Sequence, residues 1–184
     1  MLRLLYSILF ICTSLAGQQI SFDKEDITFY LDSDFIKVVG NYWFSNQTNE
    51  LIESDIYYPF PHSAGKAIDS ISVYNLSKFQ ELPFQRENKF GLSFYLTTEP
   101  SDTVICQIKY RQALNSDSAV YILESTKSWN RPLNSADFKL VIPNSLNITK
   151  FSYPPDKSYE IEKFKIYLWK RKNFMPDKNM IFHF

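Results

Sequence analysis

The stretch FIKVVGNYWFSNQTNELIESDIYYPFP, residues 35–61, decides the fold of this chain. Apolar and polar side chains alternate on both sides of the central SNQTNE segment, and such alternation is typical of strands with one buried face. The polar centre indicates a turn. Pro59 and Pro61 mark the end of the second strand, because proline cannot donate a hydrogen bond to a sheet ladder. We therefore expect two antiparallel strands joined by this turn, without residues that carry chemistry.

The same alternation recurs along the whole chain, and no segment shows a sustained helical repeat of apolar residues. Residues 90–97 and 104–111 flank the turn sequence Glu99-Pro100-Ser101-Asp102 and predict a hairpin. Along residues 159–169 the apolar positions shift by one, which indicates a β-bulge near Glu162 and Lys163. About ten strands at this spacing predict an all-β protein, an antiparallel two-sheet β-sandwich.

The N-terminal residues have the pattern of a secretory signal peptide, residues 1–16. Arg3 precedes an apolar run over residues 4–15, and small residues place the cleavage site between Ala16 and Gly17. Residues 17–184 then form a single β-sandwich domain. We expect no integral membrane segment after cleavage, because no later segment has the roughly 20 apolar residues that a spanning helix needs. The composition favours a bacterial protein exported to the periplasm or the extracellular space.

The charge of the chain bears on its partners, and its cysteine content bears on disulfide bonding. The chain has 20 basic and 20 acidic residues and no net charge, which gives no reason to expect nucleic acid as a partner. Cys12 lies in the signal region, so a cleaved chain keeps one cysteine and has no internal disulfide. That cysteine, Cys106, is in phase with Val104 and Ile108, which predicts an inert thiol in the core.

No local motif indicates catalysis, a metal or a cofactor. His62 lies in a loop, and His183 is out of phase with the apolar residues of the last strand and is expected to face solvent. Carboxylates at residues 23–26 and 32–34 could serve Ca²⁺, but neither group has the spacing of an EF-hand. Residues 32–34 are better interpreted as a hairpin turn. We therefore predict no catalytic residue, no metal site and no cofactor.

Two segments combine aromatic and basic side chains. Trp129, Arg131 and Pro132 form a candidate interaction loop, because Trp and Arg dominate interface hot spots. The alternative is a structural corner, in which the Trp ring closes one end of the sandwich. The second segment, residues 163–172, is interpreted as a strand that turns Lys163, Lys165, Tyr167 and Trp169 towards solvent, where lysines deter edge-to-edge pairing.

The stretch from Val38 to Pro61 resembles the start of VIT-like domains, the sandwich of vault proteins and inter-alpha-trypsin inhibitor heavy chains. The residues that carry the resemblance are Tyr42, Phe44, Asn46, Tyr58, Phe60 and Pro61. The more distal Trp-x-Arg-Pro loop and the closing Asn-Phe-x-Pro segment are similar to uncharacterised exported bacterial relatives. The resemblance implies an antiparallel β-sandwich, no cofactor and no catalytic residues.

These observations favour a non-enzymatic exported domain, a protein-interaction module with an unknown protein partner at the cell envelope or outside the cell. One alternative is a small outer-membrane β-barrel, because the chain ends in alternating apolar residues and a terminal Phe184. A second alternative is a hydrolase with a non-local site, in which His62 would lie in a deep pocket beside a carboxylate.

Overall fold

The computed structural model describes residues 20–61, 68–87 and 90–184. Fourteen strands and a short 3-10 helix lie in these ranges, so the all-β prediction is confirmed, although more strands are present than the ten or so expected. The predicted signal peptide, the cleavage site at Ala16 and Gly17, and His62 lie outside the described residues. Within the described ranges, none of the helical segments has the length and apolar character needed to cross a membrane.

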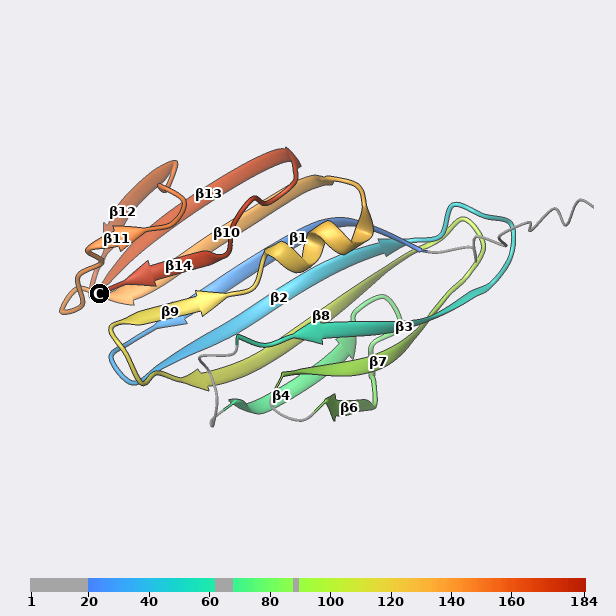
Figure 1. Ribbon diagram of the computed structural model, residues 1–184, viewed down its shortest axis with the longest axis horizontal. Helices are drawn as coiled ribbons and strands as arrows, with labels where there is room; N and C mark the ends of the chain where they lie inside the picture. The colour runs from blue at the N-terminus through green and yellow to red at the C-terminus, as the bar shows by residue number, and fades with distance from the viewer. Residues whose placement is uncertain (1–19, 62–67, 88–89) are drawn as a thin grey trace, which may run out of the picture.

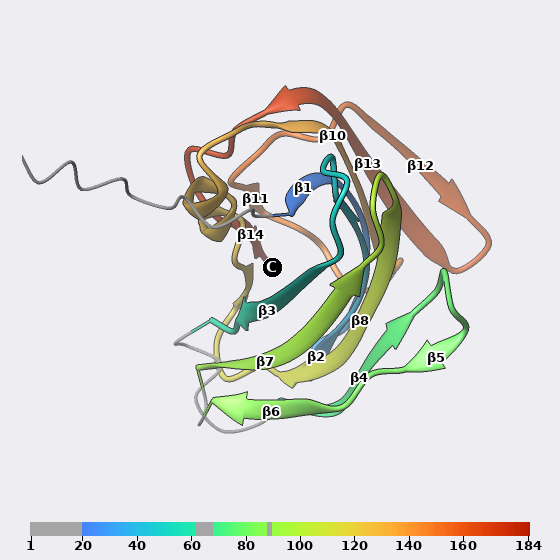
Figure 2. The same cartoon turned by 90° about the vertical axis from the view of Figure 1, so that its right-hand side faces the viewer.

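Eight strands form one large open sheet in the order β12-β13-β10-β1-β2-β8-β4-β5, with β12 and β5 as its edges (Figure 1 and Figure 2). The strands are β1 (Ser21–Leu31), β2 (Phe35–Ser45), β4 (Ile68–Asn75), β5 (Gln80–Glu81), β8 (Thr103–Ala113), β10 (Leu133–Pro143), β12 (Lys157–Ile161) and β13 (Phe164–Phe174). The expectation of purely antiparallel pairing was wrong, because β1 and β10 are parallel. Parallel neighbours need a long connection, and here most of the chain lies between the two strands.

The second layer consists of two three-stranded sheets on the concave side of the large sheet (Figure 2). One has the order β11-β14-β9, and the other has the order β3-β7-β6. Their strands are β3 (Ile52–Pro59), β6 (Phe84–Glu87), β7 (Gly91–Thr98), β9 (Ser118–Tyr121), β11 (Lys150–Phe151) and β14 (Met180–His183). Strands β3 and β9 are edges of their sheets, so the second layer is interrupted between them. Helix η2 (Glu124–Trp129) follows β9 directly.

Both predicted hairpins of the central region were wrong in their pairing. Strand β2 pairs with β1 and β8, whereas β3 pairs with β7, so the polar turn after β2 carries the chain from one layer to the other. The connection from β7 to β8 also changes layers. Asn46 links the β2–β3 connection to the β7–β8 connection. Its Nδ2 donates to the carbonyl groups of Glu50, Thr98 and Glu99 at 2.7, 3.1 and 3.1 Å. Alternation showed which face is buried, but it did not identify the pairing strand.

The predicted turn at residues 32–34 is confirmed, since it joins β1 and β2 as a hairpin. Asp32 Oδ1 accepts hydrogen bonds from the backbone N–H groups of Asp34 and Phe35 at 2.8 and 2.9 Å. This is the Asx-type bonding that favours aspartate in tight turns. The Asp32 carboxylate therefore stabilises its own turn by accepting hydrogen bonds from the backbone.

The predicted bulge at Glu162 and Lys163 is instead a tight turn between two strands. Ile161 pairs with Phe164 across it, and Glu162 has a left-handed backbone with φ of 51°. The faces of β13 are consequently opposite to those predicted. Trp169 is only 1% exposed rather than facing solvent, and its indole N–H donates to the carbonyl of Tyr153 at 2.8 Å. The shift in phase marked the change of strand, which alternation alone cannot distinguish from a bulge.

The core lies between the two layers and includes the inner face of β8. Val104, Cys106 and Ile108 are all buried there, as their common phase predicted. Burial also raises the pKa of the Cys106 thiol to about 12, so the sulfur stays protonated. The predicted place of Cys106 in the core is therefore confirmed, and the raised pKa of its thiol supports the prediction that it is inert.

Candidate functional site between the sheets

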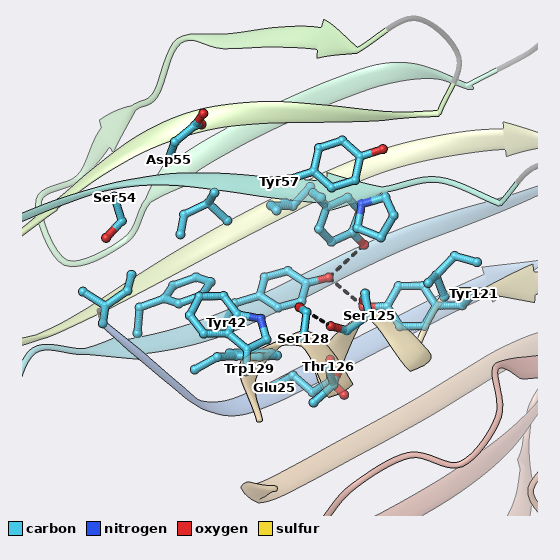
Figure 3. A pocket seen from close by; sticks show the side chains of 18 residues that line it. Glu25, Tyr42, Ser54, Asp55, Tyr57, Tyr121, Ser125, Thr126, Ser128 and Trp129 are labelled. Atoms are coloured by element: carbon cyan, nitrogen blue, oxygen red, sulfur yellow. Dashed lines mark hydrogen bonds between the residues drawn. The ribbon is translucent and has the colours of Figure 1, made fainter. Parts of the chain in front are cut away.

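A cavity of about 620 Å³ lies where the second layer is interrupted. Strands β1, β2 and β8 contribute to its lining from the large sheet, β3 forms one wall, and β9 with η2 forms the other (Figure 3). The volume is within the range of sites that bind small molecules. Seven aromatic residues line the cavity, namely Phe22, Tyr42, Phe44, Tyr57, Tyr58, Tyr121 and Trp129.

An irregularity in β1 places Phe22 and Glu25 on the same face of the sheet. Phe22 pairs with Phe44 on β2, but Lys24 pairs with the adjacent Trp43, so Asp23 is an extra residue in the ladder. In a regular strand, residues three apart would face opposite sides of the sheet. The bulge shifts this phase, and Phe22 and Glu25 both line the cavity. Bulges commonly re-aim side chains beside functional sites.

The Glu25 carboxyl group is buried without a compensating charge. Its residue is only 2% exposed, and Oε1 has no hydrogen-bond partner among the described residues. Burial raises the pKa of this carboxyl to about 8, so it is mostly protonated at neutral pH. The charged lining residues are Glu25 and Asp55, and Figure 3 shows them on opposite sides of the cavity. A buried, strongly shifted carboxyl in a cavity is a candidate functional group.

Three tyrosine hydroxyls form a chain beside Glu25. Tyr42 Oη lies 3.0 Å from Tyr58 Oη and 2.9 Å from Tyr121 Oη, and these residues come from β2, β3 and β9. Burial raises the pKa of each phenol well above its usual value, so all three keep their protons. The chain links the large sheet to both parts of the second layer and brings polar atoms to the lining.

Gly40 makes room for the central ring of this chain. It lies two residues before Tyr42 on β2, and both residues are buried. A Cβ atom at residue 40 would lie 2.5 Å from Cζ of the Tyr42 ring, which is closer than atoms can pack. The absence of a side chain at Gly40 therefore allows the phenol to lie across the strand and reach its two partners.

The predicted interaction loop contributes to the aromatic wall. Trp129 packs against Phe22 and Phe44, with ring centroids 5.7 Å apart in both pairs. It is half-buried, as expected for the alternative in which the ring closes a corner. Trp129 is also the last residue of η2, and thus this helix sets the position of the indole.

Arg131 holds the bulge of β1. Its Nη1 donates to Ser21 Oγ at 2.6 Å, and its Nη2 lies 3.3 Å from Asp23 Oδ1. Ser45 Oγ donates to the other carboxylate oxygen of Asp23. Pro132 is half-buried beside this cluster in sequence. The binding of a protein by Trp129, Arg131 and Pro132 stays a prediction, but the first two residues have internal contacts of their own.

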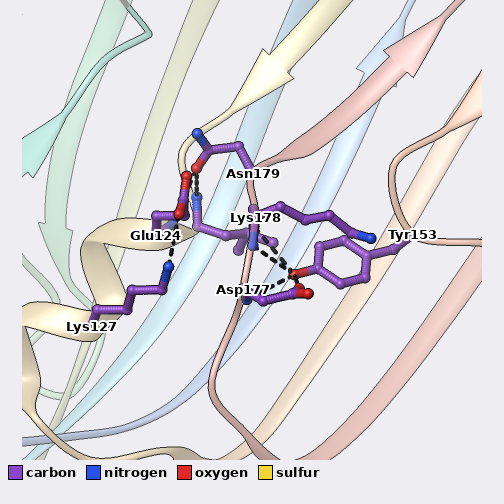
Figure 4. Close-up of polar contacts among 7 residues, drawn as sticks. Glu124, Lys127, Tyr153, Asp177, Lys178 and Asn179 are labelled. Atoms are coloured by element: carbon purple, nitrogen blue, oxygen red, sulfur yellow. Dashed lines mark hydrogen bonds and ion pairs between the residues drawn. The ribbon is translucent and has the colours of Figure 1, made fainter.

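Helix η2 is fixed to the loop before β14 (Figure 4). Asn179 Oδ1 accepts hydrogen bonds from the backbone N–H groups of Leu123 and Glu124 at 2.9 and 3.1 Å. These donors lie at the start of the helix, where backbone N–H groups lack intrahelical partners. Tyr153 holds the same loop, because its Oη donates to Asp177 Oδ1 at 2.5 Å and accepts from the N–H of Lys178 at 3.2 Å.

The other residues considered from the sequence lie away from the cavity lining. His183 is half-buried on β14 and pairs with Lys150 and Ser118. In the ranges that the structure describes, no group of three or more His, Cys, Asp or Glu side chains could hold a metal ion. Asp32 bonds its own turn, and Asp23 contacts Arg131 and Ser45.

Sequence reasoning missed Glu25 and the tyrosine chain. One signal was present: Glu25 is in phase with Ile27, Phe29 and Leu31, which are buried in the same strand. A carboxyl at an inward position of an otherwise apolar strand face is a buried polar group that needs an explanation. No comparable signal existed for the tyrosine chain, since its members come from three elements distant in the sequence.

No family model matches this sequence, and no curated protein matches it. Among solved structures, a Legionella pneumophila protein described as a "putative nutrient binding protein" is similar with a TM-score of 0.66 and 14% identity. That match covers 90% of this chain and 67% of the Legionella protein. At this identity the similarity shows a shared fold alone.

An M1 zinc metallopeptidase from Deinococcus radiodurans is similar with a TM-score of 0.55 and 10% identity, over 91% of this chain and 43% of the peptidase. A mutant of that peptidase bound to a Tyr-Ser-Ala substrate gives a TM-score of 0.56 and 10% identity, over 90% and 42% of the two chains. This chain thus spans less than half of the peptidase's length. These descriptions name no VIT domain, so the VIT-like resemblance stays a prediction.

Proposed function

We propose that the protein is an exported, non-enzymatic binding domain whose ligand site is the cavity between its sheets. The observation that carries the proposal is the lining itself, which combines seven aromatic residues with the buried, unpaired carboxyl of Glu25. Ligand sites are mostly apolar concavities with a few placed polar groups. The description of the Legionella structure as nutrient-binding is consistent with such a role.

The arrangement of polar groups supports binding rather than turnover. Glu25 and Asp55 lie on opposite sides of the cavity in Figure 3, and the Tyr42 hydroxyl bonds to other tyrosine hydroxyls. Ser128 Oγ donates to the carbonyl of Ser125, which does not activate it as a nucleophile. In the described part of the lining, no hydroxyl is hydrogen-bonded to a carboxylate or a histidine, as an activated nucleophile requires.

Export to the periplasm or the extracellular space belongs to the same proposal and rests on the N-terminal sequence. A protein partner at the envelope is also compatible with the cavity, because Trp129 belongs both to the candidate interaction loop and to the cavity wall. A VIT-like β-sandwich is the finer description of the fold that we propose. It is supported by the two-layer arrangement and by Asn46, whose hydrogen bonds link the two connections between the layers, β2–β3 and β7–β8.

The test uses Nile red, a neutral apolar dye whose fluorescence rises in apolar sites, with residues 17–184. We expect binding by the wild type and loss of binding when the cavity is filled by Ser125→Trp from η2 or Ser54→Trp from β3. Ser158→Trp is the matched control, because Ser158 is exposed on β12. Equal dye binding by the filled and control variants, or no binding by the wild type, would contradict the proposal.

A further inference from the structure

We propose that the cavity selects a cationic ligand, a primary ammonium group attached to an apolar body, with the ammonium held by Glu25 and the tyrosine hydroxyls. The inference rests on the proposed binding function and adds the chemical class of the ligand. Three independent features of the lining carry it: its hydrogen-bonding balance, its aromatic content and the sign of its charges.

The polar atoms of the lining have a surplus of acceptors. Each tyrosine hydroxyl supplies one proton and more than one lone pair, so the chain through Tyr42, Tyr58 and Tyr121 leaves acceptor capacity unused. Glu25 adds a carboxyl whose Oε1 has no partner among the described residues. An ammonium group carries three donors and no acceptor, which complements this balance. A carboxylate or phosphate ligand brings only acceptors, so it can pair with the one phenolic proton that the chain leaves free and with the proton of Glu25, but not with the remaining lone pairs.

The apolar part of the lining suits the body of such a ligand. Phe22, Phe44 and Trp129 pack with their ring centroids 5.3 to 5.7 Å apart. Aromatic faces attract cations as well as apolar groups, since the ring quadrupole is negative at its face. The wall therefore favours a cation with an apolar or aromatic body over a neutral molecule of the same shape.

The charges of the lining have one sign. Glu25 and Asp55 are its charged residues, and none of the described lining residues is Lys, Arg or His. Lys24, the neighbour of Glu25, is directed elsewhere, because its Nζ lies 4.4 Å from the centroid of the Trp43 ring. Asp55 is exposed on β3, so Glu25 is the buried acidic group that a ligand cation meets, without a protein cation among the described lining residues.

Binding of a cation is coupled to the proton on Glu25. The titratable groups that interact with Glu25 are the phenols of Tyr42 and Tyr121, whose pKa values burial raises well above the usual value, so they keep their protons through pH 8. The phenols of Tyr58 and Tyr110 have pKa values raised by burial in the same way. The ammonium group stabilises the ionised carboxylate, so the carboxyl must release its proton as the ligand binds. Affinity for a cation should rise as the pH increases from about 6 to about 8, where the free carboxyl titrates, and then level off.

The experiment compares three probes of one size: phenethylamine as the cation, 2-phenylethanol as the neutral form and 3-phenylpropionate as the anion. Affinities are measured by titration calorimetry against residues 17–184 between pH 6 and pH 8. We expect phenethylamine to bind at least about tenfold more tightly than 2-phenylethanol at pH 8, the typical effect of a charge-assisted hydrogen bond. We expect 3-phenylpropionate to bind most weakly.

The variant Glu25→Gln keeps the shape of the side chain and removes its charge. We expect it to reduce the affinity for phenethylamine to that for 2-phenylethanol, to abolish the pH dependence and to leave the alcohol unaffected. Asp26→Asn is the matched control, since Asp26 follows Glu25 on β1 and is not part of the cavity lining. The control should retain the wild-type preference for the cation.

The outcomes separate this inference from the proposed function. If Nile red binds in the cavity but phenethylamine and 2-phenylethanol bind equally, the cavity binds ligands and the cation preference is wrong. If the preference persists in Glu25→Gln, the carboxyl does not recognise the ammonium and the inference is wrong as well. If neither Nile red nor the three probes bind, both proposals fail.

Discussion

Glu25 and Tyr42 are paired directly across β1 and β2, and both side chains line the cavity between the sheets. One is a buried carboxyl without a partner for Oε1, and the other is the centre of a chain of three hydroxyls. Glu25 is in phase with the buried residues Ile27, Phe29 and Leu31 of β1, and the bulge at Asp23 adds Phe22 to the same face of the sheet. The bulge, the carboxyl and the hydroxyl chain therefore form one unit, and each part can be tested separately.

The first prediction concerns the dependence of stability on pH. The native pKa of Glu25 is about 8, against an ordinary value of 4.5, so the unfolded state releases this proton at lower pH than the native state. The free energy of unfolding should therefore fall as the pH rises from about 4.5 to about 8. At pH 7 the loss is on the order of 3 kcal/mol relative to pH 4.5.

Urea denaturation of the wild type and Glu25→Gln at pH 5 and pH 7 checks this prediction. The variant should be more stable than the wild type at pH 7 and should show a much smaller change between the two pH values. Asp177→Asn is the control, because the bond from Tyr153 lowers the pKa of Asp177 and places its titration below this range. The same pH dependence in the wild type and Glu25→Gln would show that the carboxyl is not buried and unpaired.

The second prediction concerns the space that Gly40 leaves for Tyr42. The Cβ of Gly40→Ala would overlap the Tyr42 ring and displace the phenol from Tyr58 and Tyr121. We expect a loss of about 1 to 3 kcal/mol in the free energy of unfolding, as for other overpacked cores. Nile red binding should weaken in the same variant.

Val39→Thr is the matched control for this change, because Val39 is the adjacent half-buried residue of β2. Its side chain lies on the opposite face of β2 from Gly40 and Tyr42, so we expect the control to keep normal dye binding and to lose less stability than Gly40→Ala. If Gly40→Ala is as stable as this control and binds the dye normally, the Tyr42 ring does not lie across Gly40.

The third prediction concerns the attachment of η2. Asn179→Ala removes the acceptor of the Leu123 and Glu124 N–H groups, and the loss of such a cap costs about 1 kcal/mol. Hydrogen exchange at these two amides should become faster, and binding in the cavity should weaken because η2 carries Trp129. Asn134→Ala, at an exposed residue of β10, should leave both measurements unchanged. Protection of the two amides in Asn179→Ala would contradict the proposed attachment.

The fourth prediction concerns the contact between Arg131 and Asp23 at the bulge. A double-mutant cycle with Arg131→Met and Asp23→Asn should give a coupling energy of up to about 1 kcal/mol, since both groups are partly exposed. The exposed pair Lys127 and Glu124 should give about 0.3 kcal/mol in the same assay. Additive effects of the two changes at the bulge would show that Arg131 does not hold Asp23.

The sequence predicted which face of a strand is buried, but it did not predict which strands pair. The phase of Val104, Cys106 and Ile108 placed these residues in the core, because a strand has a period of two whatever its neighbours are. Pairing depends on contacts between segments far apart in the chain. For this reason β2 and β3, and likewise β7 and β8, were predicted as hairpins although each pair is divided between the two layers.

The candidate site was harder to predict than the fold for a similar reason. Asp32 could be assigned to its turn, since its hydrogen bonds are local. Trp129 was recognised as unusual, but its packing against Phe22 and Phe44 is set by tertiary structure. Glu25 is in phase with the buried side of β1, but its place in a cavity depends on β3, β9 and η2, which are distant in the sequence. The cavity itself arises from a gap between two sheets, which has no sequence motif.

The central claim is that Glu25 is protonated in the empty cavity and ionised when it holds a cation. The most direct measurement is the number of protons released when phenethylamine binds at pH 7, obtained by calorimetry in two buffers of different ionisation enthalpy. We predict the release of close to one proton by the wild type and none by Glu25→Gln. Binding of phenethylamine to the wild type without proton release would contradict the claim.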